Sequence, residues 1–424
     1  MKRIIDTVKR CLLGLILVGI PLSMVYGGTG NIKIQPYVTI QEEYNDNINL
    51  TSKDQKKELI STVYPGIKIS GADSTYGFDL NYRLGVFFYA SSPEYNYISH
   101  TGKLNTWVKL NPRWTFRLKE DLLRSEDPWE RDYYDAALEN QSYYSINRQR
   151  AIYLRNTVEP SVEYQFGKDD RFILTYRNNI YQTQNQQSQG SQENSIKTNF
   201  SYWFNIKNGI VLDYNYTQGV FEHSPDLKSH LAKIRYLYRL SPRTTFYGEY
   251  SFLNNEFQSP GINYAVHNPI FGIDHAFSPT LSGSAQAGYF WKNSDQGTAD
   301  GYSYKAALTK KDSKTIYNLS VQGGFTQDYF TAQNLGFVRY NRAVGKITHQ
   351  LRERMTLGIS GLLERAEFDF NRTDWIWGVM GTASYQLLKW LTLSLEASHR
   401  EDNSNVDLNS FGENRVMFKL TAIY

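Results

Sequence analysis

The sequence has almost no cysteine, because the single residue of this type, Cys11, lies within the first 27 of 424 residues. Without a second cysteine the chain cannot form an internal disulfide or a thiolate metal site. Long apolar runs are also missing. After residue 30 no run approaches the roughly 20 apolar residues that a membrane-spanning helix needs, so the sequence excludes helical membrane proteins.

Sequence signatures of catalysis are absent as well. There is no Gly-rich phosphate loop, no closely spaced His or Cys cluster and no Gly-x-Ser-x-Gly elbow. The histidines are scattered, and we interpret them as polar residues of the interior or rim rather than as metal ligands: His100, His223, His230, His267, His275, His349 and His399. We therefore expect no enzyme, no catalytic residue, no cofactor and no metal.

The first 27 residues have the features of a secretory signal. A basic segment precedes an apolar stretch from Cys11 to Ile20, and the small-residue sequence Val25–Gly27 follows. The apolar stretch spans only about a dozen residues before Pro21, which is short for a retained membrane anchor. We expect cleavage after Gly27 and a mature domain of residues 28–424.

The net charge of +4 belongs largely to this expected signal. Its removal would take away four of the 46 basic and one of the 42 acidic residues, leaving a net charge of about +1. A nucleic-acid-binding surface normally shows as a clustered basic excess. We therefore expect no nucleic-acid partner.

Aromatic residues are abundant, at 15% of the chain with 33 Tyr and 22 Phe, although the mean hydropathy is only −0.52. From Ile32 onward, segments of roughly ten to fourteen residues alternate large apolar with polar side chains. Phe172, Leu174 and Tyr176 share one face of such a segment, while Thr175 and Arg177 share the other. This pattern predicts β-strands with one apolar and one hydrated face.

Strands of this kind can cross a bilayer only in a closed barrel, because an open edge would leave backbone groups unpaired in hydrocarbon. The last ten residues, Arg415–Tyr424, alternate in the same way and end on an aromatic ring, which is typical of a closing strand. Short turns such as Ser241–Arg243 alternate with longer polar breaks. The longer breaks are expected at Asn45–Lys57, Ser125–Arg150, Gln182–Glu193, Glu222–Asp226, Asn293–Asp300 and Glu401–Gly412.

We therefore predict an all-β fold, a transmembrane antiparallel β-barrel of about 18 to 20 strands in a single domain, with both termini in the periplasm. The segments Ile32–Tyr44 and Asp374–Leu387 are the weakest strand candidates. A soluble β-sandwich, β-helix or propeller is the alternative. It is disfavoured because the strands are long, the apolar face is rich in Tyr, Phe and Trp, and no blade-length motif recurs.

Charged residues on the hydrated faces are the candidates for function. The basic residues expected to line the pore are Lys68, Arg83, Lys109, Arg117, Lys119, Arg177, Lys233, Arg235, Arg239 and Lys419, and the acids include Asp79, Glu159, Glu163, Asp213 and Glu249. Rings of charge set the selectivity of a pore. Alternatively, these residues only solvate the inner face through cross-strand ion pairs that select nothing.

The longest break, Ser125–Arg150, combines six acids with five Trp or Tyr residues. It could fold into the interior as a constriction, or it could lie outside the cell as a surface loop. A barrel of this size would enclose water. Because no plug domain precedes the first expected strand, we do not expect a TonB-type receptor.

Two segments near the start of the expected mature chain resemble the putative beta-barrel porin 2 family of outer-membrane proteins. They are Pro36–Ile48, which contains Tyr44-Asn45-Asp46-Asn47, and Val63–Ile67, which contains Pro65-Gly66. The resemblance implies an association with exopolysaccharide synthesis and export or with exosortase systems in Gram-negative bacteria. It supplies no catalytic residue.

The leading hypothesis is a porin-like, passive outer-membrane conduit associated with exopolysaccharide export. The alternatives are a structural or assembly barrel of a secretion complex with little conductance, and an enzyme with its residues on the barrel rim. The expected partners are outer-membrane lipid and lipopolysaccharide, the barrel-assembly machinery, and a polysaccharide or its export complex.

Overall fold

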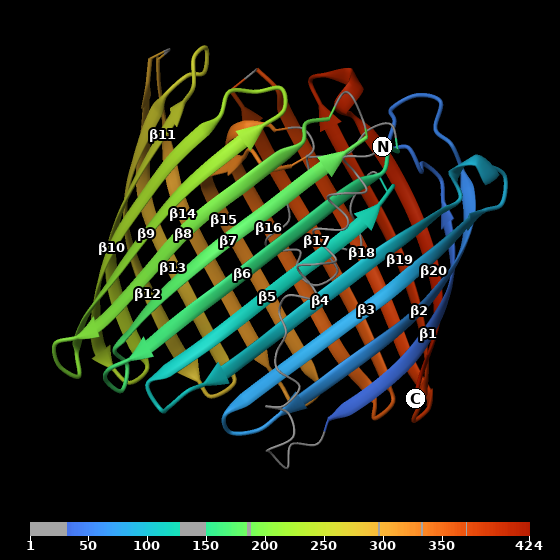
Figure 1. Ribbon diagram of the computed structural model, residues 1–424, viewed down its shortest axis with the longest axis horizontal. Coiled ribbons are helices and arrows are strands. Elements are labelled where there is room, and N and C mark those ends of the chain that lie inside the picture. Colours follow the sequence, from blue (N-terminus) through green and yellow to red (C-terminus); the bar gives the residue numbers. More distant parts are fainter. Residues whose placement is uncertain (1–31, 128–149, 185–187, 296, 332–333, 370) are drawn as a thin grey trace.

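The computed structural model describes residues 32–127, 150–184, 188–295, 297–331, 334–369 and 371–424. Its twenty strands form one antiparallel sheet, which Figure 1 shows as a barrel of tilted strands. The sheet closes because β1 pairs with β20, from Tyr37 opposite Ile423 to Asn45 opposite Arg415. Closure leaves no unpaired strand edge, as a bilayer requires. The predicted fold class and strand number are thus confirmed.

The strands are β1 (Lys33–Asn45), β2 (Glu58–Ala72), β3 (Tyr76–Tyr89), β4 (Tyr97–Lys109), β5 (Trp114–Ser125), β6 (Tyr153–Gln165), β7 (Arg171–Thr183), β8 (Ser191–Trp203), β9 (Asn208–Phe221), β10 (Leu227–Ser241), β11 (Thr244–Phe257), β12 (Tyr264–Ser278), β13 (Leu281–Ser294), β14 (Gly297–Lys311), β15 (Thr315–Asp328), β16 (Gly336–Arg352), β17 (Met355–Phe368), β18 (Thr373–Leu388), β19 (Leu391–Ser404) and β20 (Phe411–Ile423). Two short 3₁₀ helices, η1 (Pro93–Tyr95) and η3 (Asp407–Asn409), lie in connections. Among the described residues, no helix is long and apolar enough to cross a membrane.

Side chains alternate between the two faces of each strand, as the period of two requires. In β10, Ile234 and Tyr236 are 46% and 48% exposed, whereas the neighbouring Lys233 and Arg235 lie on the opposite face. The exposed apolar side chains face outward, because the other face of a closed sheet encloses the interior. The charged set therefore points inward.

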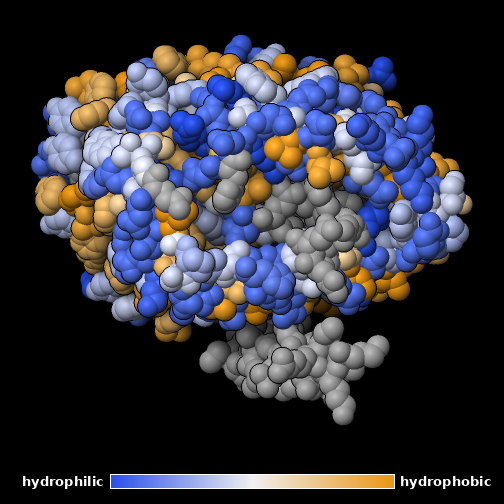
Figure 2. Space-filling model, turned by 90° about the horizontal axis from the view of Figure 1, so that it is seen from above, coloured by the Kyte–Doolittle hydropathy of each residue, from blue (hydrophilic) through white to orange (hydrophobic). Residues whose placement is uncertain are grey.

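The two ends of the barrel differ in the length of their connections. At one end, the short-turn end, the connections are 73–75, 110–113, 166–170, 204–207, 242–243, 279–280, 312–314, 353–354 and 389–390. At the other, the long-loop end, they are 46–57, 90–96, 126–152, 184–190, 222–226, 258–263, 295–296, 329–335, 369–372 and 405–410. β1 starts and β20 finishes at the short-turn end (Figure 1). Figure 2 shows the long-loop end, where hydrophilic residues cover much of the face and hydrophobic residues gather along the margins.

One predicted break is wrong. Asn293–Asp300 does not form a long loop, because β13 continues to Ser294 and β14 starts at Gly297. Asn293 pairs with Thr298, and Gly297 has a φ of 132°, which a glycine adopts readily. Polar residues can remain in β-strands here because the end of β13 and the start of β14 lie at the long-loop end, where water can solvate them. The weak candidates at the two ends of the chain are both strands, β1 and β18.

Buried apolar residues gather at the long-loop end rather than along the whole interior. One cluster contains Ile48, Ile60, Tyr64, Phe87, Tyr89 and Tyr97, and a larger one contains Phe221, Leu227, Leu253, Tyr264, Val266, Phe290, Tyr329 and Phe337. Most of these side chains come from the strand ends that join the long loops. The packed core of the molecule therefore narrows one end of the barrel.

Candidate functional site in the barrel interior

The structure places the ten basic residues predicted to line a pore on the inward face. Each alternates along its strand with outward residues such as Leu174, Tyr176, Ile234 and Tyr236, which are exposed. The strands that carry them are β2 to β5, β7, β10 and β20. They form a charged inner surface on the part of the barrel wall that runs from β20 through β1 to β10.

Six of these residues make ion pairs with carboxylates, five of them on an adjacent strand and one, Arg239, with a residue of the connection 166–170. The pairs are Lys68 with Asp79, Arg117 with Glu163, Arg177 with Glu159 and Glu193, Arg235 with Glu249, Arg239 with Asp169, and Lys419 with Glu396. The predicted acid Asp213 instead accepts a hydrogen bond from Asn199 Nδ2 at 2.6 Å. Cross-strand pairing thus balances the inner charge locally.

The remaining four basic residues divide into two kinds. Arg83 and Lys109 lie over the rings of Tyr64 and Trp107, with their charged groups 4.8 and 5.3 Å from the ring centroids. Within the described ranges, Lys119 and Lys233 have no carboxylate at ion-pair distance. These two cations can therefore attract a diffusible anion more readily than the paired ones.

Arg177 shows how the strand register builds the network. It extends from β7 to both neighbours, with Nη1 3.0 Å from Glu159 on β6 and Nε 3.3 Å from Glu193 on β8. In the register, Arg177 lies opposite Ser195 on β8, so Glu193 is a diagonal neighbour. One guanidinium thus connects three strands across the interior surface.

A more deeply buried ion pair, which the sequence did not reveal, lies on β16 and β17. Arg342 Nε is 2.7 Å from Glu364 Oε2, and the two side chains are 8% and 0% exposed. Close by in the register, Arg372 binds Asp374, again with both side chains buried. The alternation of polar and apolar residues shows which face of a strand a residue lies on, but not how deeply it is buried. The sequence therefore could not distinguish these buried charges from hydrated ones.

Described residues of the connection between β15 and β16, Phe330 and Asn334, reach across the interior. The Phe330 ring stacks against Phe221 at the end of β9, with ring centroids 5.4 Å apart. Its carbonyl oxygen accepts a hydrogen bond from Arg155 Nη2 of β6 at 3.5 Å, and Asn334 Nδ2 donates to Ser224 Oγ at 3.2 Å. Because β6 and β15 lie nine strands apart in a twenty-stranded barrel, this connection bridges nearly opposite walls.

The connection between β1 and β2 also folds inward. Ile48 and Leu50 are fully buried, and Ile48 packs with the aromatic cluster of β2 to β4. Asn47 fixes the loop, because its Nδ2 donates to the carbonyl oxygens of Thr51 and Gly412. These hydrogen bonds stabilise the turn, and this structural role accounts for the Asn–Asp–Asn sequence.

The break at Ser125–Arg150, for which both a constriction and a surface loop were considered, falls mostly on residues 128–149, which lie outside the described residues. At its end, Arg150 lies over the rings of Tyr89 and Tyr95 and hydrogen-bonds to the hydroxyl of Tyr89. At its start, burial raises the pKa of Glu126, although Arg150 and Arg124 oppose that shift. The narrowing that the described residues show comes from the connections 46–57 and 329–335.

Five of the seven histidines hydrogen-bond through Nδ1 to a hydroxyl group on an adjacent strand. The pairs are Tyr82 with His100, Tyr214 with His230, Tyr250 with His267, Thr244 with His275, and Thr315 with His349. These histidines alternate with inward residues and lie on the outward face near strand ends, so the interior position considered for them is wrong. Among the described residues, no group of three or more His, Cys, Asp or Glu residues is placed to hold a metal ion.

A closed twenty-stranded barrel with an apolar outer face and a charged interior defines the class as a porin-like barrel of the outer-membrane type. The family described as "Putative beta-barrel porin 2" matches residues 222–424. The family resemblance seen in the sequence is thereby confirmed for this part of the chain. The segments Pro36–Ile48 and Val63–Ile67, which carried the resemblance, precede the match.

Solved structures with a similar fold include two receptors from Pseudomonas aeruginosa. The siderophore receptor PirA matches with a TM-score of 0.52 at 7% sequence identity, over 92% of this chain and 80% of that chain. A mutant of the ferric enterobactin receptor PfeA, in complex with enterobactin, matches with a TM-score of 0.53 at 8% identity, over 92% and 81%. These likenesses show the fold alone. No curated protein matches the sequence.

Proposed function

We propose that the protein is a passive conduit of the outer membrane whose hydrated interior admits polar solutes. The observation that carries the proposal is the inward face, which bears paired and unpaired charges around a closed barrel. Charged residues on an inner wall are stable only where water or a partner solvates them. A barrel of about this strand number encloses an aqueous channel.

The family match and the exposed apolar outer face support a placement in the outer membrane. We propose that the first 27 residues act as the export signal and that the short-turn end, with both strand termini, faces the periplasm. The partners in this proposal are lipopolysaccharide and lipid at the outer face and the barrel-assembly machinery during insertion. The protein has no enzymatic role in this account.

The finer proposal is that the solute is a polysaccharide on its way out of the cell. Locally balanced ion pairs support it, because an inner wall without a strong field of one sign does not hold a charged polymer tightly. Loss of surface polysaccharide after deletion of the gene, with restoration by the wild-type copy, is the expected result. Unchanged polysaccharide export in the deletion strain would contradict this finer proposal.

A structural barrel with little conductance is the second candidate, because the connection between β15 and β16 bridges the interior. Single-channel recordings of the full chain in planar bilayers distinguish the two. A conduit gives steady, stepwise conductance, whereas a structural barrel gives none from protein that remains folded. The folded state is verified in the same sample by its heat-modifiable migration in gel electrophoresis.

A further inference from the structure

A cavity of about 610 Å³ opens at the long-loop end. It is lined by described residues of the connections 222–226 and 258–263, by Tyr329, Asn334 and Asp369, and by the ends of β13 and β14. Its volume lies within the range of small-molecule binding pockets. None of the ten predicted pore-lining residues borders it. The cavity is therefore a feature that the conduit does not explain.

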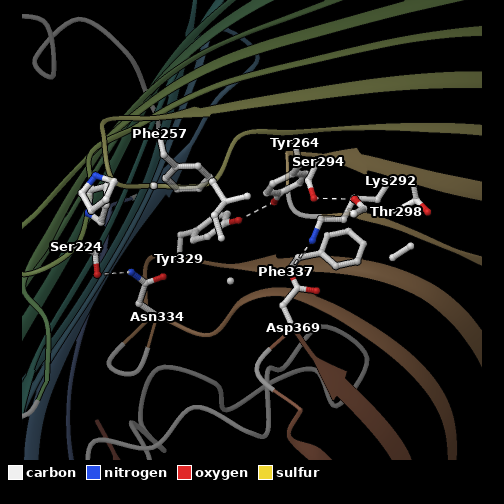
Figure 3. A pocket seen from close by; sticks show the side chains of 17 residues that line it. Ser224, Phe257, Tyr264, Lys292, Ser294, Thr298, Tyr329, Asn334, Phe337 and Asp369 are labelled. Carbon is white, nitrogen blue, oxygen red and sulfur yellow. Dashed lines mark hydrogen bonds and ion pairs between the residues drawn. The ribbon is translucent and has the colours of Figure 1, made fainter.

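Four aromatic rings form the apolar wall of this cavity. Phe257 meets Tyr329 edge to face at 5.4 Å between ring centroids, and Tyr264 meets Phe337 in the same way at 5.7 Å. The Tyr264 and Tyr329 hydroxyl groups form a hydrogen bond, with the two oxygens 2.6 Å apart. Figure 3 marks this bond with a dashed line. Asn255 and Gln327 also donate to the Tyr264 oxygen, at 2.6 and 2.9 Å, so the rings are held in fixed positions.

A charged pair forms one polar side of the cavity. Lys292 Nζ lies 2.5 Å from Asp369 Oδ2, and the lysine side chain is only 9% exposed whereas the aspartate is 44% exposed. The ammonium group is also 4.5 and 4.8 Å from the ring centroids of Phe337 and Tyr264 (Figure 3). The lysine is thus a buried donor, and the carboxylate is an acceptor that remains accessible to a ligand.

Uncharged polar groups complete the lining. Ser294, Thr298, Ser224 and Asn334 border the cavity, and their hydroxyl and amide groups can each donate and accept hydrogen bonds. Burial raises the pKa of Tyr329 well above its usual value, so its hydroxyl group stays protonated. The cavity therefore offers donors and acceptors close to flat apolar surfaces.

This combination selects among ligand classes. Because Lys292 and Asp369 neutralise each other, the cavity has no net charge that would favour an anion or a cation. A purely apolar ligand would desolvate the charged pair without replacing its hydrogen bonds, which is unfavourable. A ligand with an apolar ring face and several hydroxyl groups matches both the aromatic wall and the polar groups.

We propose that this cavity binds an uncharged sugar unit of an oligosaccharide, with the ring faces against Tyr329 and Phe257 and the hydroxyl groups on Asp369, Thr298 and Asn334. The assignment rests on the proposed conduit function and deepens it by placing a binding subsite for a saccharide solute at the long-loop end. Sugar hydroxyl groups would donate to the Asp369 carboxylate in charge-assisted hydrogen bonds.

Titration calorimetry of the full chain in detergent micelles tests the site. The probes are neutral hexasaccharides of glucose, galactose and mannose, with a hexagalacturonate as the charged comparison. We expect saturable binding of at least one neutral probe and weaker binding of the charged one. Asp369→Asn should weaken neutral binding by roughly tenfold, because it removes a charged acceptor at nearly constant volume.

Asp300→Asn is the matched control, because Asp300 is an exposed acid of β14 that does not line the cavity, and it should leave binding unchanged. Thr298→Val is a second test, because Thr298 is exposed and does not support the core. It should also weaken binding of the neutral probe, since it removes a hydroxyl group that lines the cavity. The assignment is overturned if no neutral probe binds, if the charged probe binds more tightly, or if Asp369→Asn binds like the wild type. Conductance without sugar binding would reject the sugar site and retain the conduit. Sugar binding without conductance would retain the sugar site and reject the conduit.

Discussion

At the scale of single residues, the interior combines two electrostatic environments. Pairs such as Lys68 with Asp79 join two side chains that are both about half exposed, in a hydrated setting. Arg342 and Glu364 are instead almost fully removed from water. Removing one partner has different consequences in the two settings, because water can solvate a charge left behind only in the first.

The buried pair gives a prediction on stability. Glu364→Leu should lower the free energy of unfolding by about 3 kcal/mol, because it leaves the buried Arg342 guanidinium without its closest carboxylate. The double variant Arg342→Met/Glu364→Leu should recover most of that loss, since it removes both charges. Urea unfolding in lipid vesicles measures these differences. Equal stability of the wild type and Glu364→Leu would contradict the account of the pair.

The pairs whose basic partner is partly exposed give a prediction on ion selectivity. Arg117→Ala combined with Arg235→Ala leaves Glu163 and Glu249 without their basic partners on the inward face. The reversal potential under a salt gradient should therefore shift toward cations. Arg365→Ala, on the outward face of β17, is the control and should leave the reversal potential unchanged. A shift of the same size in both variants would remove the link between selectivity and the inward face.

These residues show most clearly which features could be predicted from the sequence and which could not. The period of two correctly put Lys233 and Arg235 on one face and Ile234 on the other. It could not identify Glu249 as the partner of Arg235, because that depends on the register between β10 and β11. It also missed the cavity around Lys292, whose walls come from loops far apart in the sequence.

At the scale of elements, the connections decide how open the barrel is. Strand positions follow from local alternation, and so do the short turns rich in Pro, Gly, Asn and Asp. The sequence pattern did not predict the connection between β15 and β16 as one of the longer breaks. Asn334 and Gly336 have positive φ values of 49° and 76°, which their residue types tolerate and which mark a change of direction. Its path to β6 and β9 depends on contacts across the barrel that no local pattern encodes.

This connection gives a prediction on conductance. Phe330→Ala removes the ring that stacks on Phe221, and Asn334→Ala removes the hydrogen bond to Ser224. The double variant should release the connection from the wall and raise single-channel conductance by roughly a factor of two or more, since a wider passage conducts more ions. Val406→Ala, in the exposed connection between β19 and β20, serves as the control. An unchanged conductance in the double variant would show that this connection does not limit the passage.

At the scale of the whole molecule, closure of the barrel explains both the exposed rings on the outside and the charges on the inside. Closure of β1 onto β20 pairs every strand with two neighbours, so a lipid-facing surface carries no unpaired strand edge. The sequence predicted this closure from composition and alternation. The molecular detail that it could not predict is the packed narrowing at one end, since that arises from several loops meeting in space.

The central claim is that one face of each strand meets lipid while the other meets water inside the barrel. Single cysteines test it directly, because Cys11 is the only native cysteine and can be replaced by Ser. Cysteine is introduced in turn at Lys233, Ile234, Arg235 and Tyr236 in the full chain, inserted in lipid vesicles. A water-soluble, membrane-impermeant maleimide should label positions 233 and 235 and spare 234 and 236. Labelling without this alternation would contradict the account.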